Sequence, residues 1–224
     1  MIGIKLYGNN ALLINFEQKI DAEIHEIVKA YYDKISGFGE VIYQIPAYCS
    51  ITVVFDKVIT DFENLKSKIE KLKITTDKTK SDAKVIEIPV CYDSEYAPDM
   101  ESLSKEIKLS PEKIISMHTS GTYDVYMMGF LPGFPYLGQL PEELECKRKA
   151  TPRKQVAAGS VAIAGKQTGI YPTDAPGGWQ LIGQTPLKIF NPLSDDAFLI
   201  KMGDKVKFKS ISAETFKTLQ KNGK

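Results

Sequence analysis

The sequence predicts an α+β protein with an N-terminal α/β domain over residues 1–83 and a C-terminal β-rich domain over residues 84–224. Three observations support this prediction. Helical and strand-like patterns alternate in the first third of the chain, and a polar segment, TTDKTKSDAK, follows them. Ten of the 16 glycines then lie between Gly121 and Gly183. A polar segment without apolar periodicity is typical of a connection between domains, so the boundary is placed there.

The N-terminal elements follow the order of a ferredoxin-like fold. Apolar residues at helical spacing predict helices over residues 20–31 and 62–72. Asp21 is a suitable N-cap for the first helix, and Thr60 with Glu63 has the form of a capping box for the second. The order β-α-β-β-α-β is that of a split βαβ unit, although its last strand fits either domain. Apolar and β-branched runs predict its strands at residues 11–16, 41–45, 50–55 and 84–90.

The second domain begins with helical patterns and continues as short strands. Met100, Leu103 and Ile107 line one face of a predicted helix, and Ser110-Pro111 begins another that ends near His118. The pattern that follows is typical of a small β-barrel or sandwich. Its predicted strands are residues 123–128, 160–164, 187–190, 198–200 and 206–208, with a closing helix near 213–219.

Composition argues against several classes of partner and site. The net charge is +1 and lysine greatly outnumbers arginine, which argues against nucleic acid. No apolar run is long enough for a bilayer, and the first residues do not resemble a signal peptide. Three distant cysteines and two histidines predict neither a disulfide framework nor a metal site. A cytoplasmic protein without a membrane partner is expected.

The segment GSVAIAGK, Gly159 to Lys166, resembles a phosphate-binding loop only superficially. Its spacing is one residue too long, and Gln167 stands where serine or threonine is required. Its centre is apolar and strand-like. The segment is therefore predicted to be a strand that ends in a turn, and no phosphate loop is expected in this chain.

The glycine-rich region combines polar side chains with aromatic ones, as sites for small polar ligands do. The same polar residues alternatively tie down long loops through hydrogen bonds to backbone. His118 is either a helix-capping residue or a site residue, because the helix dipole favours a cation there. Trp179 fits a ligand platform, a protein-contact hot spot or a barrel plug. The polar candidates are Arg153, Gln167, Tyr171, Asp174 and Gln180.

Several long motifs resemble those of the KipI/PxpB family, also labelled allophanate hydrolase subunit 1. They are YMMGFLPGFPYLG, TPRKQVAAGSVAIAG, QTGIYP and PGGWQLIGQTP, together with IPAYCSITVVFD and IPVCYD. The resemblance covers nearly the whole chain and implies an N-terminal α/β domain followed by a cyclophilin-like β-barrel. Two turns depart from the family pattern, at residues 92–95 and 155–158.

The resemblance implies a role in a heteromeric complex. The leading expectation is the PxpB-type subunit of an ATP-dependent 5-oxoprolinase, which opens the lactam of 5-oxo-L-proline to L-glutamate, with this chain inactive alone. The expected partners are a KipA/PxpC-type and a LamB/YcsF-type subunit, and ATP is used by the complex. The alternatives are a KipI-type inhibitor of a sporulation sensor histidine kinase and a carboxyltransferase partner as in urea carboxylase. The barrel alone suggests a peptidyl-prolyl isomerase, a weak inference from fold.

Roles in the expected oxoprolinase site are assigned to the residues of the glycine-rich region and to His118. His118 is expected to shuttle a proton, and Arg153 or Lys166 to hold the substrate carboxylate. Backbone amides of the glycine-rich turns are expected to stabilise developing negative charge. The predicted catalytic residues are His118, Arg153 and Gln167; the substrate-binding residues are Lys166, Tyr171, Asp174, Trp179 and Gln180; and the partner-contact residues are Phe134 and Tyr136.

Overall fold

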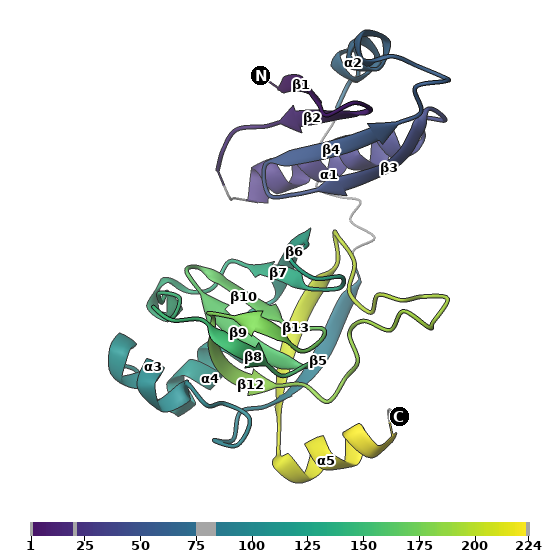
Figure 1. Cartoon of the computed structure of the whole chain (residues 1–224). Helices are drawn as coiled ribbons and strands as arrows, with labels where there is room; N and C mark the ends of the chain where they lie inside the picture. Colours follow the sequence, from purple (N-terminus) through teal and green to yellow (C-terminus); the bar gives the residue numbers. More distant parts are fainter. Residues whose placement is uncertain (1, 20–21, 75–83, 223–224) are drawn as a thin grey trace. The chain divides into compact units, whose positions relative to one another are not determined.

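The computed structural model describes residues 2–19, 22–74 and 84–222, and its contacts divide the chain into two compact units, Met1–Asp82 and Ala83–Lys224. This division lies one residue from the predicted boundary. Asp21, the predicted helix cap, and most of the polar connecting segment lie outside the described residues. The mixed α+β class is confirmed, with a sheet and helices in the first unit and a barrel in the second (Figure 1).

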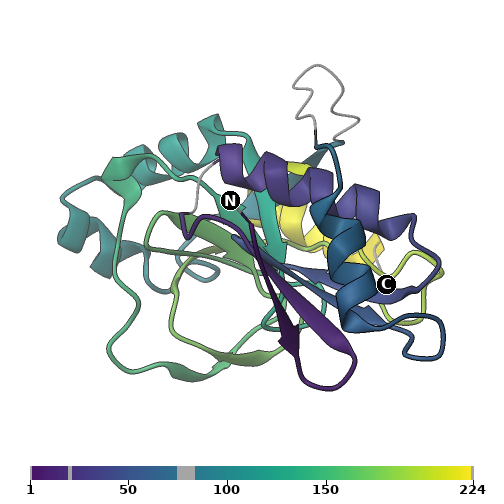
Figure 2. The same ribbon diagram turned by 90° about the horizontal axis from the view of Figure 1, so that it is seen from above.

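The N-terminal unit is an antiparallel sheet in the order β1-β2-β4-β3, with α1 and α2 on one side of it (Figure 1, Figure 2). Alternate residues of its central strands, such as Leu12 and Ile14, are fully buried because successive side chains point to opposite faces. The element bounds are β1 Gly3–Tyr7, β2 Ala11–Asn15, α1 Ala22–Ser36, β3 Val41–Pro46, β4 Ser50–Phe55 and α2 Phe62–Glu70.

The split βαβ unit is present, but the strand at the edge of its sheet is not the predicted one. β4 lies between β2 and β3, as a split βαβ unit requires. The edge beside β2 is occupied by β1, which joins it through a turn where Gly8 has a φ of +69°. A hairpin neighbour pairs locally, because glycine adopts the positive φ of its turn without strain. The predicted strand at residues 84–90 therefore belongs to the barrel.

Helix α2 starts one residue later than the predicted capping box implies. Asp61 is the N-cap, and its carboxylate accepts a hydrogen bond from the Asn64 amide at 2.8 Å. A carboxylate at this position also interacts favourably with the positive end of the helix dipole. The predicted cap at Thr60 is corrected accordingly.

The C-terminal unit is a barrel that closes in the order β10-β7-β6-β13-β5-β12-β9. β13 pairs with β5 in parallel, and each other neighbouring pair is antiparallel. Helices α3 and α4 lie next to each other against the barrel (Figure 1). The barrel strands are β5 Val85–Cys91, β6 Tyr123–Met128, β7 Pro135–Gly138, β9 Ser160–Ala164, β10 Gln167–Ile170, β12 Gln180–Gln184 and β13 Lys205–Ile211. The other elements are α3 Met100–Ile107, α4 Pro111–Ser120, η1 Glu142–Leu144, α5 Ala213–Asn222 and a ribbon of β8 Arg153–Val156 with β11 Ala175–Gly177.

Two of the predicted strands are absent from the described barrel. Residues 187–190 and 198–200 form a projecting loop, in which Phe190 and Phe198 make an isolated bridge (Figure 1). Their rings pack at 5.1 Å, which accounts for the apolar runs without a strand. The predicted strands at 123–128, 160–164 and 206–208 and the closing helix are confirmed.

Two apolar clusters lie on opposite faces of β9. Val161 and Ile163 face the barrel interior, where they join residues of every part of the barrel. Ala162 and Ala164 point the other way, as period-two alternation requires, and belong to an outer cluster. The barrel interior includes Val125, Leu137, Ile182, Val206 and Phe208; the outer cluster includes Phe134, Tyr171, Trp179 and Leu181.

Candidate functional site

Glycines of the motif region make room for the aromatic rings of the outer cluster. A Cβ atom at Gly169 would lie 2.9 Å from the Phe134 ring, and one at Gly177 would lie 2.3 Å from the Tyr171 hydroxyl oxygen. Such distances are shorter than van der Waals contact, so only glycine fits at either position. The glycines are therefore part of the site's construction, because they let the rings approach the sheet.

The outer cluster is a continuous set of aromatic contacts. The Phe134 ring meets those of Tyr171 and Trp179 edge-on, with centroids 5.2 and 5.6 Å apart. Tyr136 meets Trp179 at 5.7 Å. These separations fall in the favourable range for aromatic pairs. The prediction that Phe134 contacts a partner is wrong, because the ring is 1% exposed beneath its neighbours; Tyr136 is half-buried.

A buried carboxylate, Asp99, organises the cations beside this cluster. Its Oδ1 accepts hydrogen bonds from Arg153 Nη2 at 2.6 Å and Lys149 Nζ at 2.8 Å. Its Oδ2 accepts one from the Leu181 amide at 2.7 Å. Burial raises the pKa of Asp99, but the bonds from Arg153, Lys149 and Leu181 outweigh it, so the pKa lies below its usual value. Asp99 is thus ionised and fixes Arg153 against the barrel.

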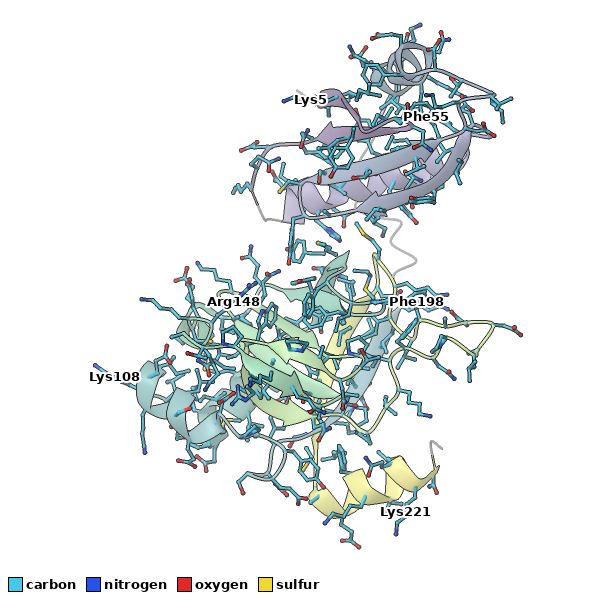
Figure 3. All side chains as sticks on the ribbon, in the orientation of Figure 1. Lys5, Phe55, Lys108, Arg148, Phe198 and Lys221 are labelled. Atoms are coloured by element: carbon cyan, nitrogen blue, oxygen red, sulfur yellow. The ribbon has the colours of Figure 1, made fainter. Side chains whose placement is uncertain are left out.

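Arg148 completes the arrangement from the exposed side. Its guanidinium lies over the Trp179 ring, 5.8 Å from the centroid, within the range of a cation–π contact. Figure 3 places Arg148 and Phe198 of the projecting loop on opposite sides of the barrel. We call this surface the arginine–aromatic face; it consists of Tyr136, Arg148, Arg153, Tyr171 and Trp179.

His118 lies away from this face, inside the barrel. It is 0% exposed, its Nδ1 is 2.8 Å from the Tyr92 hydroxyl, and its Nε2 is 2.9 Å from Thr168 Oγ1. The imidazole stacks on Phe208 at 4.4 Å. Burial lowers the pKa of His118 to about 3, so the ring is neutral at physiological pH. The predicted proton shuttle is corrected: both ring nitrogens are occupied by structural bonds, and the ring has no access to solvent.

Lys166 and Asp174 are also outside the arginine–aromatic face. Lys166 lies on the β9–β10 turn, where its ammonium is 3.3 Å from Glu142 and 3.7 Å from Glu145. Asp174 accepts bonds from the Ala158 amide and the Gln155 side chain. Asp174 therefore ties a loop to its neighbour, which is the expected alternative to ligand binding. These contacts account for both side chains without a ligand, and their assignment to substrate binding stays a prediction.

The two predicted glutamines have different positions. Gln180 is 6% exposed, and its Nε2 donates to the Lys147 carbonyl at 3.1 Å, which anchors the segment that carries Arg148. Gln167 begins β10 at the edge of the β9–β10 turn and is half-buried. Gln180 thus supports the arginine–aromatic face from within the barrel wall, whereas Gln167 lies with the turn of Lys166.

Two other sequence predictions concern metal and phosphate groups. Residues 160–164 of the GSVAIAGK segment are β9, and every one of them is buried, which confirms the predicted strand and turn.

In the residues that the structure describes, no three metal-ligating side chains gather, and no helix has the length and apolar character to cross a bilayer. The three cysteines are free and buried, and burial raises the pKa of Cys146 to about 12, which disfavours a reactive thiolate.

The fold and the site define a two-unit α+β protein whose β-barrel presents a cationic aromatic face. The chain belongs to the family of the carboxyltransferase domain, subdomains C and D, whose model matches residues 2–200. It is 41% identical over 226 residues to a 5-oxoprolinase subunit of Bacillus subtilis (strain 168), covering 95% of this chain and 94% of that one. The family predicted from the motifs is therefore confirmed.

Solved structures agree with this family membership. The crystal structure of TTHA0988 is 29% identical with a TM-score of 0.81, and the match covers 91% of this chain and 40% of that one. This chain therefore spans about two fifths of that protein. The urea amidolyase of K. lactis is 17% identical with a TM-score of 0.75, covering 99% of this chain and 15% of that one, which shows a shared fold.

Proposed function

We propose that this chain is the PxpB-type subunit of an ATP-dependent 5-oxoprolinase, working with KipA/PxpC-type and LamB/YcsF-type subunits to open 5-oxo-L-proline to L-glutamate. The observation that carries the proposal is similarity to a 5-oxoprolinase subunit over 95% of this chain. The arginine–aromatic face supports it, because it offers cations and the half-buried Tyr136 ring to a small carboxylated ring. The protein would be inactive alone and located in the cytoplasm.

The residues of this chain do not suit the phosphates of ATP. The segment closest in sequence to a phosphate loop is the buried strand β9, and the lysine that follows it is paired with Glu142 and Glu145. A phosphate cradle requires exposed backbone amides and an available lysine. We therefore assign ATP to another subunit of the complex, where it would make the lactam oxygen a better leaving group.

The task left to this chain is to bind and orient the lactam. Holding a reactant in a fixed position lowers the entropic part of the barrier, and cations preset around an anion stabilise it without reorganisation. The arginine–aromatic face has both properties, since Asp99 fixes Arg153 and the Trp179 ring contacts Arg148. His118 takes no part in proton transfer in this scheme, because it is buried and neutral.

The test is ATP-dependent release of glutamate from 5-oxo-L-proline by the chain co-expressed with its own organism's KipA/PxpC-type and LamB/YcsF-type proteins. We expect activity from the complete complex and none when any one subunit is omitted. A complex that assembles, hydrolyses ATP and releases no glutamate would contradict the proposal.

A carboxyltransferase-type subunit is the second candidate, favoured by the description of the matching family model. It predicts transfer of a carboxyl group to an amide substrate. Incorporation of labelled bicarbonate by the same complex, with ATP and candidate amides, distinguishes the two: an oxoprolinase incorporates no label.

A further inference from the structure

The arginine–aromatic face carries more positive charge than its own residues neutralise. The sequence from Lys147 to Lys154, KRKATPRK, contains both arginines of the chain among five positive charges. Asp99 is the carboxylate that binds two of them, Lys149 and Arg153, through one oxygen. One negative charge cannot balance two cations, so the group retains positive charge beside a buried apolar surface, where charge interactions are strong.

Arg153 has a terminal nitrogen that Asp99 does not use. Nη2 donates to Oδ1 at 2.6 Å, whereas Nη1 is shielded from solvent and has no hydrogen-bond partner among the described residues. Buried donors without an acceptor are costly and uncommon in native proteins. An anionic oxygen brought by a ligand would satisfy this donor, and a guanidinium fixed at one end is preset to bind it.

Arg148 presents a second guanidinium at the same place. It stacks on Trp179, and within residues 2–19, 22–74 and 84–222 no carboxylate pairs with it. Stacking uses the flat face of the guanidinium and leaves its N–H edge available to a carboxylate. Burial raises the pKa of Tyr171, while the Trp179 amide and the charges of Arg148 and Arg153 act in the opposite direction. Both guanidinium groups therefore lie near the same phenol.

We propose that Arg148 and Arg153 together bind the carboxylate of a small, flat anion, while the half-buried Tyr136 contacts the ring that bears it. Asp99 is a positioning residue, because it acts by holding Arg153. Arg148 is exposed, so an anion reaches it without rearrangement of the barrel. The inference rests on the proposed function for the choice of ligand, 5-oxo-L-proline, whose five-membered ring carries one carboxylate.

Comparing two lactams distinguishes binding through the carboxylate from binding through the ring. 5-Oxo-L-proline has a lactam ring and a carboxylate, whereas 2-pyrrolidinone has the same lactam ring without the carboxylate. Binding to the full chain is followed by fluorescence of Trp179, the single tryptophan, and KM is measured in the assembled complex. We expect Arg148→Met and Arg153→Met each to weaken 5-oxo-L-proline about tenfold or more, as loss of a charged hydrogen bond does, and to leave 2-pyrrolidinone unchanged.

Matched variants separate a specific contact from general charge. Lys154→Met removes one positive charge from the same segment without touching Asp99 or Trp179, and we expect less than about a twofold change at moderate salt. Arg148→Lys keeps the charge but loses the planar fork, so its effect should be intermediate. Asp99→Asn should raise KM for 5-oxo-L-proline and leave kcat unchanged, because a positioning residue for the carboxylate does not touch the reacting amide.

The outcomes distinguish this inference from the proposed function. An active complex whose Arg148→Met and Arg153→Met variants keep the wild-type KM and the wild-type preference for 5-oxo-L-proline overturns the inference and leaves the function standing. A complex that makes no glutamate, while the chain still binds 5-oxo-L-proline more tightly than 2-pyrrolidinone through Arg148, supports the carboxylate site and overturns the function.

Discussion

The barrel interior and the arginine–aromatic face both contain buried aromatic rings, yet their polar groups differ in how fully they are hydrogen-bonded. In the interior, His118 is bonded at both ring nitrogens and stacks on Phe208. On the face, Arg153 leaves one terminal nitrogen unused within the described structure, and Arg148 rests on Trp179. The polar group beside the aromatic rings is therefore fully hydrogen-bonded in the interior, whereas on the face it retains a donor without an acceptor.

The difference teaches how a buried polar residue is to be interpreted. A fully bonded group such as His118 specifies one packing arrangement and stabilises it, because any other arrangement leaves a polar atom unpaired. A group with spare bonding capacity lowers the stability of the free protein and is ready for a ligand. Burial and aromatic neighbours alone do not separate these cases, whereas the count of satisfied bonds does.

The largest effect should come from the barrel interior. Phe208→Ala removes a ring that is 1% exposed and stacked on His118, and we expect a loss of about 4 kcal/mol in the free energy of unfolding. The matched change Phe130→Ala, at a ring 58% exposed, should cost at most about 1 kcal/mol. Urea unfolding followed by Trp179 fluorescence measures both, since the single tryptophan belongs to the barrel unit. Equal losses would contradict the comparison.

Acid should weaken the interior through His118. Its pKa is about 3 in the folded barrel against about 6.5 unfolded, so below pH 6.5 only the unfolded chain takes up the proton. Stability attributable to this group falls as pH falls, by about 2 kcal/mol from pH 6.5 to 4.5. Unfolding of the wild type and His118→Gln at both pH values isolates this contribution, because other groups titrate in both proteins.

If the two proteins lose stability in parallel, His118 is not a neutral, desolvated group in the folded barrel. An NMR titration of the imidazole gives a second measurement that does not need the variant to fold. It should show the neutral form of His118 persisting at pH 5.

A smaller effect is expected on the arginine–aromatic face. Asp99→Asn removes the charge that Lys149 and Arg153 share, and we expect a loss of about 2 kcal/mol at pH 7. The value is modest because both cations are partly exposed and can turn to water. The pKa of Asp99 is lowered in the folded state, so this contribution is present above its unfolded pKa, about 3.9, and disappears as pH falls through the folded value. A variant as stable as the wild type at pH 7 would show that Asp99 does not organise the face.

The smallest effect is expected at Lys166. Its partners Glu142 and Glu145 are exposed, and exposed ion pairs contribute little. Lys166→Ala should leave the thermal midpoint and the KM for 5-oxo-L-proline unchanged. A large rise in KM would restore Lys166 as a substrate-binding residue and place the site at the β9–β10 turn.

Most of the barrel strands that the sequence pattern does not predict differ in composition from those that it predicts. β6, β9 and β13 are runs of apolar or alternating residues, such as Val125, Val161 and Phe208, which are typical of strands. β7, β10, β11 and β12 are short and contain glycine or proline, so local preference argues against them. They form because neighbouring strands supply partners and because glycine at positions such as 169 admits an aromatic ring. Such reasons are tertiary and are invisible to a local pattern.

The candidate site shows the same limit. Motifs led to Arg153, Tyr171 and Trp179, which the fold does bring together. Asp99 was missed because it stands before helix α3 like an ordinary cap, although its carboxylate bonds residues 50 to 82 positions away. The helix dipole suggests a charged His118, whereas this helix end is enclosed by the barrel and burial keeps the ring neutral. Long-range pairing and burial decide both cases.

The parallel pairing of β13 with β5 has a consequence for how the protein is made. Val85 of β5 and Lys205 of β13 are register partners. β5, the first strand of the barrel, therefore cannot form this pairing until about 120 further residues have been synthesised. Until then one edge of β5 and one edge of β6 stay open on the ribosome, and open edges of apolar strands recruit other chains. Barrel closure is therefore a late event of high contact order. Yield in the cell should depend on chaperones that shield nascent strands.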